Sequence, residues 1–197
     1  MAILMTGLCE KGVELIWKQC NEELYPQGIE YLEEAAHAGD AEGWFFLGNC
    51  YSWGDGAVGF SDKKAYECYK KGIEGGSVRC VLGAARAGQF DEELKKASPC
   101  TLEESYRAVL QSAEEGDAFS AFQIAAAYEW EAIFDLLQPE EQKRENCYKW
   151  YEQAAKGGIV SAMVKVGKCC LNGQYVPKNE EMALKWADRC AALGNAW

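Results

Sequence analysis

Small and apolar residues recur every three or four positions along several stretches of the chain. In the stretch that ends at Gly194 they occupy one helical face, at Ala183, Trp186, Ala187, Cys190 and Ala191. Asn179 stands where an N-cap is expected, and two glutamates follow in the first turn, where the helix dipole favours acids. Thr101, followed by two glutamates, predicts a similar helix start.

The same pattern repeats along the chain. Five stretches close on a glycine, and successive closing glycines are 37, 40, 42 and 36 residues apart: Gly39, Gly76, Gly116, Gly158 and Gly194. A small residue stands eleven positions before each of them: Gly28, Ala65, Ser105, Cys147 and Ala183. An apolar residue follows eight positions after the first four, at Leu47, Ala84, Ile124 and Val166, and a small residue comes next. A glycine suits the position just past a helix end, where φ is positive. The pattern therefore predicts a helix, a glycine corner, a second helix and a polar loop, repeated about four times.

Longer motifs carry a family resemblance. The stretch VGKCCLNGQYVPKNEEMALKWADRCAALGNA, the first repeat around Gly39, Leu47, Gly48 and Tyr51, and NCYKWYEQAAKGG resemble the Sel1-like repeat, a relative of the tetratricopeptide repeat. The resemblance implies an all-α fold, a right-handed α/α superhelix of about four repeats with an irregular middle. It spans roughly residues 26–195, so we expect residues 1–25 to form an N-terminal helix or cap and residues 26–197 to form a single array. Two departures, AARAGQFDEELKKASPC and EWEAIFDLLQPEEQKRE, should break the superhelix or add a local surface.

The ten cysteines do not follow the disulfide pattern of the cysteine-rich relatives. The resemblance places that pattern at Ala36 and Trp44, Ile73 and Val81, and Ala155 and Met163, and none of these is a cysteine. The N-terminus lacks the basic region of a signal peptide, and no run of eighteen apolar residues is present. We therefore expect a cytoplasmic chain with reduced thiols and no membrane association.

The charge of the chain bears on its partners. Asp and Glu number 31 against 20 Lys and Arg, which gives a formal charge of −11. Nucleic acid would be repelled by such a surface, whereas a basic protein would be attracted.

Residues with catalytic chemistry are scarce. His37 is the only histidine, and no nucleophile–base motif, zinc motif or phosphate-binding loop is present. Cys169 and Cys170 are adjacent, which suits core packing better than metal binding. We therefore expect no catalytic residue, no cofactor-binding residue and no metal ligand.

The helix that follows each glycine corner, which is the first helix of a Sel1-like hairpin, is expected to line the concave side of the solenoid. Side chains on that helix that the core does not require are the candidate partner-binding residues: Glu42, Phe45, Phe46, Asn49, Trp53, Phe122, Gln123, Trp130, Lys165 and Lys168. Leu82 and Arg86 stand at the equivalent positions of the second repeat. The alternative is that Phe45 or Phe46 packs between neighbouring hairpins and that the tryptophans stack on their own loops.

These patterns favour a non-enzymatic module that binds a protein or peptide on its concave face. A sharper hypothesis is an acidic inhibitor or immunity protein that neutralises a toxin or an enzyme, and the alternative is a regulatory adaptor in a signalling or envelope-assembly pathway. Hydrolase activity, suggested for cysteine-rich relatives, and thiol-based redox or metal sensing are minor alternatives. Terminal repeats also offer a surface for self-association.

Overall fold

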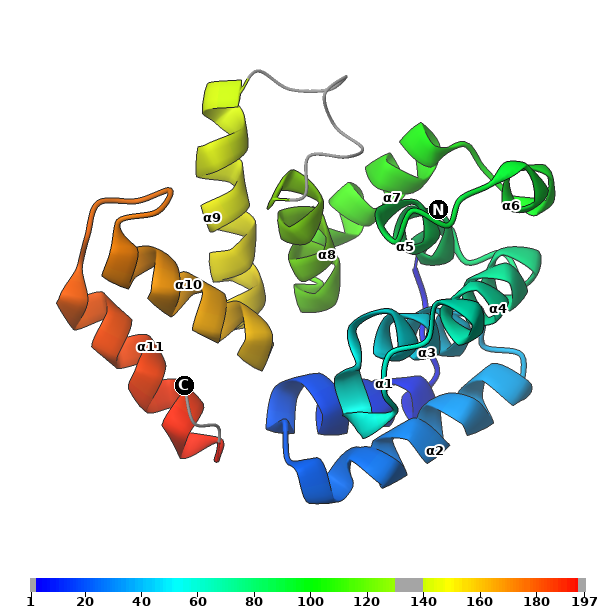
Figure 1. The fold of residues 1–197 in the computed structure, drawn as a ribbon, viewed down its shortest axis with the longest axis horizontal. Helices are drawn as coiled ribbons and strands as arrows, with labels where there is room; N and C mark the ends of the chain where they lie inside the picture. Colours follow the sequence, from blue (N-terminus) through cyan, green and yellow to red (C-terminus); the bar gives the residue numbers. More distant parts are fainter. Residues whose placement is uncertain (1–2, 130–139, 195–197) are drawn as a thin grey trace. The chain divides into compact units, whose positions relative to one another are not determined.

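The computed structural model describes residues 3–129 and 140–194, and every regular element in these ranges is a helix (Figure 1). The predicted all-α fold is therefore confirmed. The chain divides into two compact units, described one at a time below. The N-terminal unit comprises residues 1–16 and 21–108, and the C-terminal unit comprises residues 17–20 and 109–197.

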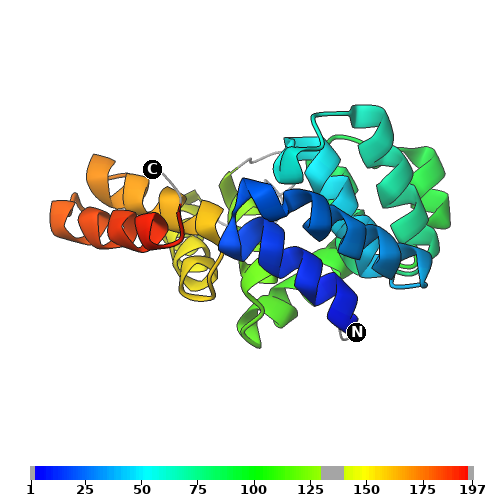
Figure 2. The same cartoon turned by 90° about the horizontal axis from the view of Figure 1, so that it is seen from below.

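In the N-terminal unit, α1 to α5 form a series in which each helix packs against the next along the chain, and α6 packs on α4. α1 (Gly7–Val13) runs into a π-helical stretch (Glu14–Gln19), and a 3-10 turn (Glu22–Leu24) leads to α2 (Tyr25–His37). α3 (Ala41–Trp53), a 3-10 turn (Asp55–Ala57), α4 (Asp62–Glu74), α5 (Val78–Arg86) and α6 (Glu92–Ala97) follow. α1 packs on α2, as Figure 2 shows in blue, and α3 packs on α2, α4 and α5. α1 therefore contributes to the packing of the first helices of the N-terminal unit.

The C-terminal unit repeats this arrangement. α7 (Leu102–Glu114) spans the division between the units, and α8 (Ala118–Glu129), α9 (Glu140–Lys156), α10 (Val160–Asn172) and α11 (Glu180–Ala192) follow it. α8 packs on α9, α9 on α10, and α10 on α11.

The glycine corners are confirmed. All five closing glycines have a positive φ, between 79° and 106°. At four of the corners the residue after the glycine donates its N–H to the carbonyl five residues before it, as in Asp40 to Ala35 (3.0 Å) and Ser77 to Gly72 (2.8 Å). This is the backbone pattern of the Schellman motif, which satisfies carbonyls at the helix end. The five corners therefore share a positive φ at the closing glycine, as the repeat pattern predicts.

The predicted helix starts are also present. Asn179 accepts the N–H of Met182 at 2.9 Å, as an N-cap does. Thr101 and Glu104 form a capping box, because the Thr101 hydroxyl accepts the Glu104 N–H (3.2 Å) and the Glu104 carboxylate accepts the Thr101 N–H (2.8 Å).

The irregular second repeat adds a helix. α5 ends at Arg86, and α6 forms within the segment that departs from the family pattern. Asp91 caps α6, Leu94 is fully buried, and the Tyr66 hydroxyl of α4 donates to Asp91 at 3.1 Å. The departure therefore adds a local surface on α4, one of the two outcomes that the sequence suggests.

Small residues allow the helices to approach closely. A Cβ on Gly48 would lie 2.6 Å from the ring of Tyr69, and a Cβ on Gly72 would lie 2.2 Å from the Sγ of Cys80. Both distances are shorter than any normal contact, so neither site has room for a side chain unless its neighbour moves. Cys80 is fully buried there, which fits a cysteine used as a compact apolar residue.

The contact between Gly72 and Cys80 predicts a pairwise effect on stability. Gly72→Ala should lower the free energy of unfolding by about 1–3 kcal/mol, because the added methyl overpacks the junction of α4 and α5. In a Cys80→Ala background the same change should cost much less, because the nearest remaining atoms then lie 3.3 Å away. A double-mutant cycle measured by urea unfolding gives the coupling. Gly7→Ala, at a site with no heavy atom within 4 Å, is the control and should not destabilise. Equal costs of Gly72→Ala in both backgrounds would contradict this packing.

Candidate functional site

Residues at the same repeat position meet where α3 packs on α5. Asn49 and Arg86 both stand ten residues after a closing glycine. The Arg86 guanidinium donates through Nη2 to Asn49 Oδ1 at 3.0 Å. The same guanidinium lies over the ring of Trp53, 5.0 Å from its centroid, which is a cation–π contact. Asn49, Trp53, Arg86 and the supporting Tyr69 are called the Trp53 cluster below.

The Trp53 cluster is supported from beneath by α4. The Tyr69 hydroxyl donates to Asn49 Oδ1 at 3.3 Å and lies 3.1 Å from the Ser52 hydroxyl. Tyr69 is fully buried, and this burial raises the pKa of its hydroxyl well above the usual value. The hydroxyl therefore stays protonated and able to donate. The side chain of Trp53 is 44% exposed, so a fixed support presents an indole ring and a guanidinium near the surface.

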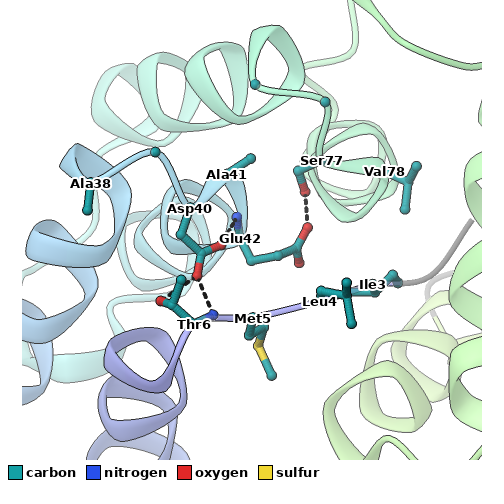
Figure 3. Close-up of a pocket in the computed structure, with 13 residues that line it drawn as sticks. Ile3, Leu4, Met5, Thr6, Ala38, Asp40, Ala41, Glu42, Ser77 and Val78 are labelled. Atoms are coloured by element: carbon teal, nitrogen blue, oxygen red, sulfur yellow. Dashed lines mark hydrogen bonds between the residues drawn. The ribbon is translucent and has the colours of Figure 1, made fainter.

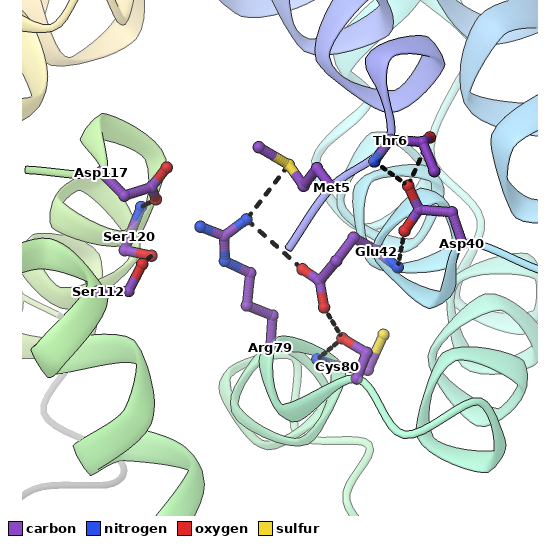
Figure 4. Close-up of polar contacts among 10 residues, drawn as sticks. Met5, Thr6, Asp40, Glu42, Arg79, Cys80, Ser112, Asp117 and Ser120 are labelled. Atoms are coloured by element: carbon purple, nitrogen blue, oxygen red, sulfur yellow. Dashed lines mark hydrogen bonds and ion pairs between the residues drawn. The ribbon is translucent and has the colours of Figure 1, made fainter. Parts of the chain in front are cut away.

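A second pair at equal repeat positions lies at the other end of α3 and α5. Glu42 and Arg79 both stand three residues after a closing glycine and are 6% and 0% exposed. Glu42 Oε2 lies 3.5 Å from Arg79 Nη1 (Figure 4), and Glu42 Oε1 accepts the Ser77 hydroxyl at 2.6 Å (Figure 3). Separating such a pair would leave a buried charge without its partner, so the pair favours the helix register in which both groups meet.

The extended segment Ile3–Thr6 lies against this same end of α3. Thr6 donates both its backbone N–H and its hydroxyl to Asp40 Oδ2, each at 2.7 Å (Figure 3). Asp40 Oδ1 accepts the N–H of Glu42 at 3.0 Å, so one carboxylate caps α3 and also holds the segment. An open pocket of about 450 Å³ lies between the segment and the glycine corners at Gly39 and Gly76.

The structure corrects the expected exposure of several candidates in the N-terminal unit. Phe45 and Phe46 are fully buried, with their ring centroids 4.9 Å apart, so both pack in the core, as the alternative interpretation holds. Glu42 and Asn49 are also buried, because α3 contacts helices on several sides. Trp53 alone among the five candidates on α3 is exposed.

The candidates in the C-terminal unit are divided in the same way. Gln123 is buried at 1% exposure, and Phe122 is half-buried between Phe119 and Tyr151, with centroid distances of 5.8 and 5.9 Å. Lys165 forms an ion pair with Glu129, and Lys168 is exposed. Trp130 lies outside the described residues.

The sequence places Arg86 on the expected binding face of the second repeat, whereas Arg79 is not a sequence candidate. Arg86 is at the equivalent position of the second repeat, yet only the structure places its guanidinium over Trp53. Arg79 carries no sequence signal except its shared repeat position with Glu42.

The structure bears on metal binding and on the environment of the single histidine. No group of three or more His, Cys, Asp or Glu side chains there could hold a metal ion. His37 is exposed at the end of α2, where its Nδ1 donates to the Glu33 carbonyl at 2.7 Å and its ring packs on Trp44. Among the described helices, none is both long and apolar enough to cross a membrane.

All ten cysteines are described, and all are free thiols. Eight of them are buried, and burial raises the pKa of the Cys68 and Cys169 thiols to about 11 and that of Cys147 to about 12. Because the thiolate is the reactive form, these thiols are poorly suited to redox chemistry near neutral pH.

Comparison with known proteins identifies the repeats. A family model, Sel1 repeat, matches residues 23–40, 42–77, 137–159 and 160–195, more than half of the chain. Among solved structures, a Sel1 repeat protein from Oxalobacter formigenes is 22% identical over 86% of this chain and 46% of that protein, with a TM-score of 0.44. Another is c5321, a protective antigen present in uropathogenic Escherichia coli strains, which displays an SLR fold. It is 20% identical over 86% of this chain and 44% of that one, with a TM-score of 0.30. The chain thus spans less than half the length of these two structures. No curated protein matches it.

Thiol burial predicts an order of alkylation. At pH 8 iodoacetamide should modify Cys20 and Cys100 first, because these two are only partly buried, and the other eight should react much more slowly. Mass spectrometry of the intact protein and of its peptides measures the order. In guanidinium chloride all ten should react at similar rates. A rapid third adduct on the native protein would show that a buried thiol is accessible.

The buried pair predicts a large loss of stability on truncation. Glu42→Ala removes the carboxylate that faces Arg79 and Ser77, and should lower the free energy of unfolding by about 3–5 kcal/mol. Glu103→Ala is the matched control, because Glu103 pairs with Arg107 on the surface of α7, where both side chains are more than half exposed, and should cost at most about 1 kcal/mol. Thermal and urea unfolding measure both. Similar small losses in the two variants would mean that the Glu42 pair contributes no more than a surface contact.

Proposed function

The chain belongs to the Sel1 repeat family, and we propose that it is a protein-interaction module whose partner contacts the Trp53 cluster on α3 and α5. Repeats of this family act as protein–protein interaction modules. Trp, Tyr and Arg dominate the energetic centres of protein interfaces. The observation that carries the proposal is the half-exposed Trp53 ring, held by Arg86 from the next repeat.

Preorganisation supports this site further. Arg86 is already oriented by Asn49, and Asn49 is oriented by the buried Tyr69. A partner that docks on Trp53 therefore loses little side-chain entropy at this point, which favours affinity.

The exposure of the remaining candidate residues separates those proposed to contact a partner from those proposed to hold the surface in place. Lys168 and the half-buried Phe122 are proposed to contact a partner on the C-terminal unit. The buried candidates are proposed to shape the surface from below: Glu42, Phe45, Phe46, Asn49 and Gln123. Lys165, paired with Glu129, is assigned the same supporting role.

The chemistry of the partner follows from charge. A formal charge of −11 favours a basic protein and speeds its association. A reducing, cytoplasmic location is proposed because all ten thiols are free and eight are buried. A second copy of the chain is the alternative partner, supported by the exposed Met182 and Leu184 on α11, and sedimentation equilibrium distinguishes it.

Two biological roles fit such a module. An inhibitor or immunity protein that neutralises a toxin or an enzyme should form a one-to-one complex with a Kd in the nanomolar range or below, whereas a regulatory adaptor should bind at about micromolar Kd. Acidity and a preorganised surface support the inhibitor. Affinity capture from the source cell at low and high salt, with mass spectrometry, separates the roles by stoichiometry and salt resistance.

A matched pair of tryptophan variants tests the site. Trp53→Ala should leave the fold intact and weaken binding of the captured partner at least about tenfold, because the indole is a central contact. Trp44→Ala is the control, since Trp44 lies nine residues earlier on α3 and therefore about 180° round the helix. It also sits under a cation, with Lys71 Nζ 4.2 Å from its ring centroid. Isothermal titration measures the Kd, and circular dichroism checks the fold.

Arg86→Ala should weaken binding in the same direction as Trp53→Ala. Equal affinities for the wild type and the Trp53→Ala variant would overturn the proposed site, and unfolding of Trp53→Ala would assign that residue to the core.

A further inference from the structure

The N-terminal segment Ile3–Thr6 is seated as an extended peptide across the N-terminal end of α3. Thr6 has extended backbone angles, φ −74° and ψ 159°, and caps α1. The 13 residues of α3 separate this end from the Trp53 cluster by about 20 Å. The seat is therefore a different place from the proposed site on Trp53 and is tested separately.

The contacts of the segment define what the seat accepts. Asp40 Oδ2 accepts two hydrogen bonds from one residue, the backbone N–H and the hydroxyl of Thr6. A valine or alanine would supply only the first of these. At the preceding residue, the Met5 thioether accepts a hydrogen bond from Arg79 Nη1 at 3.6 Å. The seat thus matches an extended chain in which a thioether residue precedes a threonine.

The walls of the seat come from two neighbouring repeats. Ala38, Gly39 and Ala41 line it at the first glycine corner, and Gly75 and Gly76 line it at the second. Glu42 and Ser77, joined by a hydrogen bond, lie between these corners (Figure 3). Small residues at both corners leave the pocket of about 450 Å³ open beside the segment. Space for a longer or bulkier peptide is therefore present next to the four residues that now occupy the seat.

The segment covers its seat only loosely. Leu4 is 80% exposed, and Ile3 and Met5 are only partly buried. Thr6 and Met5 of the segment form hydrogen bonds with the side chains of Asp40 and Arg79. A four-residue segment with side chains this exposed is the kind of element that opens locally at a modest free-energy cost.

We propose that this seat, defined by Asp40, Glu42, Ser77, Arg79 and the two glycine corners, is a docking site for an extended segment of a partner protein. The partner segment carries a threonine or serine that binds Asp40, preceded by a methionine or similar apolar residue that faces Arg79. Residues 3–6 of the chain occupy the seat in cis and compete with the partner. Because a tethered segment acts at an effective concentration of about millimolar, an untethered peptide binds weakly until the cis segment is loosened.

The test uses a synthetic peptide with the sequence of residues 3–7, Ile-Leu-Met-Thr-Gly, extended by a soluble fluorescent tail. Met5→Gly in the full chain removes the thioether contact with Arg79 and adds backbone freedom to the cis segment, which makes displacement of Thr6 from Asp40 easier, and it retains the Thr6 side chain that caps α1. This variant should bind the peptide at least about tenfold more tightly than the wild type, as measured by fluorescence anisotropy. Thr6→Val, which removes the hydroxyl donor from the cis segment, is the second variant and should act in the same direction.

Two matched controls identify the contact. Asp40→Asn keeps an oxygen to cap α3 but turns an amide N–H toward the donors of the peptide, so Met5→Gly/Asp40→Asn should lose the binding gained. A peptide with valine in place of threonine should bind the Met5→Gly variant at least about fivefold more weakly, because it lacks the second hydrogen bond to Asp40.

The proposal is overturned if both loosened variants keep the circular dichroism of the wild type yet bind the peptide no better. It is also overturned if the threonine and valine peptides bind equally, because the interaction is then only apolar adhesion. Loss of binding at Trp53 leaves this result unaffected, so the two sites fail or stand independently.

Discussion

Close approach between helices of neighbouring hairpins is the constraint on which the N-terminal unit depends. Gly72 brings α4 so near to α5 that the Cys80 thiol fills the space where a side chain would begin. Gly48 does the same for α3 against the ring of Tyr69 on α4. With the helices this near, the positions of their side chains along the axis are fixed by contact, because a packed interior tolerates little displacement. Everything polar between the helices must then be satisfied in that one register.

Equal register explains why chemically different residues meet at equal repeat positions. At the third position after the closing glycine, Glu42 of one repeat faces Arg79 of the next. At the tenth position, Asn49 faces Arg86. Neither pair is close in sequence, and a shift of one helical turn would separate both. The two pairs thus depend on the glycine contacts, and the Trp53 cluster depends in turn on Arg86.

Features set by local chain conformation were predictable from the sequence. The closing glycines and the caps at Asn179 and Thr101 depend on a few neighbouring residues, and the structure contains them as expected.

Burial on α3 was harder to predict from the sequence because it depends on the packing of α2, α4 and α5 around this helix. The sequence of α3, AEGWFFLGNCYSW, is apolar on nearly all sides, which is the pattern of a helix enclosed by neighbours rather than of one with an open face. Phe45 and Phe46 are consequently in the core, and Trp53, at the last residue of α3, reaches the surface. The contact of Trp53 with Arg86 could not be predicted from the sequence, because Arg86 lies more than thirty residues away, in the repeat that departs most from the family pattern.

Specificity in this chain is expected at the positions that the repeat leaves free. The closing glycines are required by their positive φ, and small residues such as Gly48 and Gly72 are required where the helices approach closely. The third position holds Glu42, Arg79, Phe119 and Ser161, and the tenth holds Asn49, Arg86, Ala126 and Lys168. Such variation gives each repeat different side-chain contacts at these positions, which are buried for Glu42, Arg79 and Asn49 and exposed for Lys168. α3 therefore has a proposed binding position at each end. Asp40, which caps the helix, holds an extended segment, and the Trp53 indole lies against Arg86 of the next repeat. A partner that bound both ends of α3 would span about 20 Å. Binding at one end would raise the effective concentration of the partner at the other end, so the two contacts would strengthen each other.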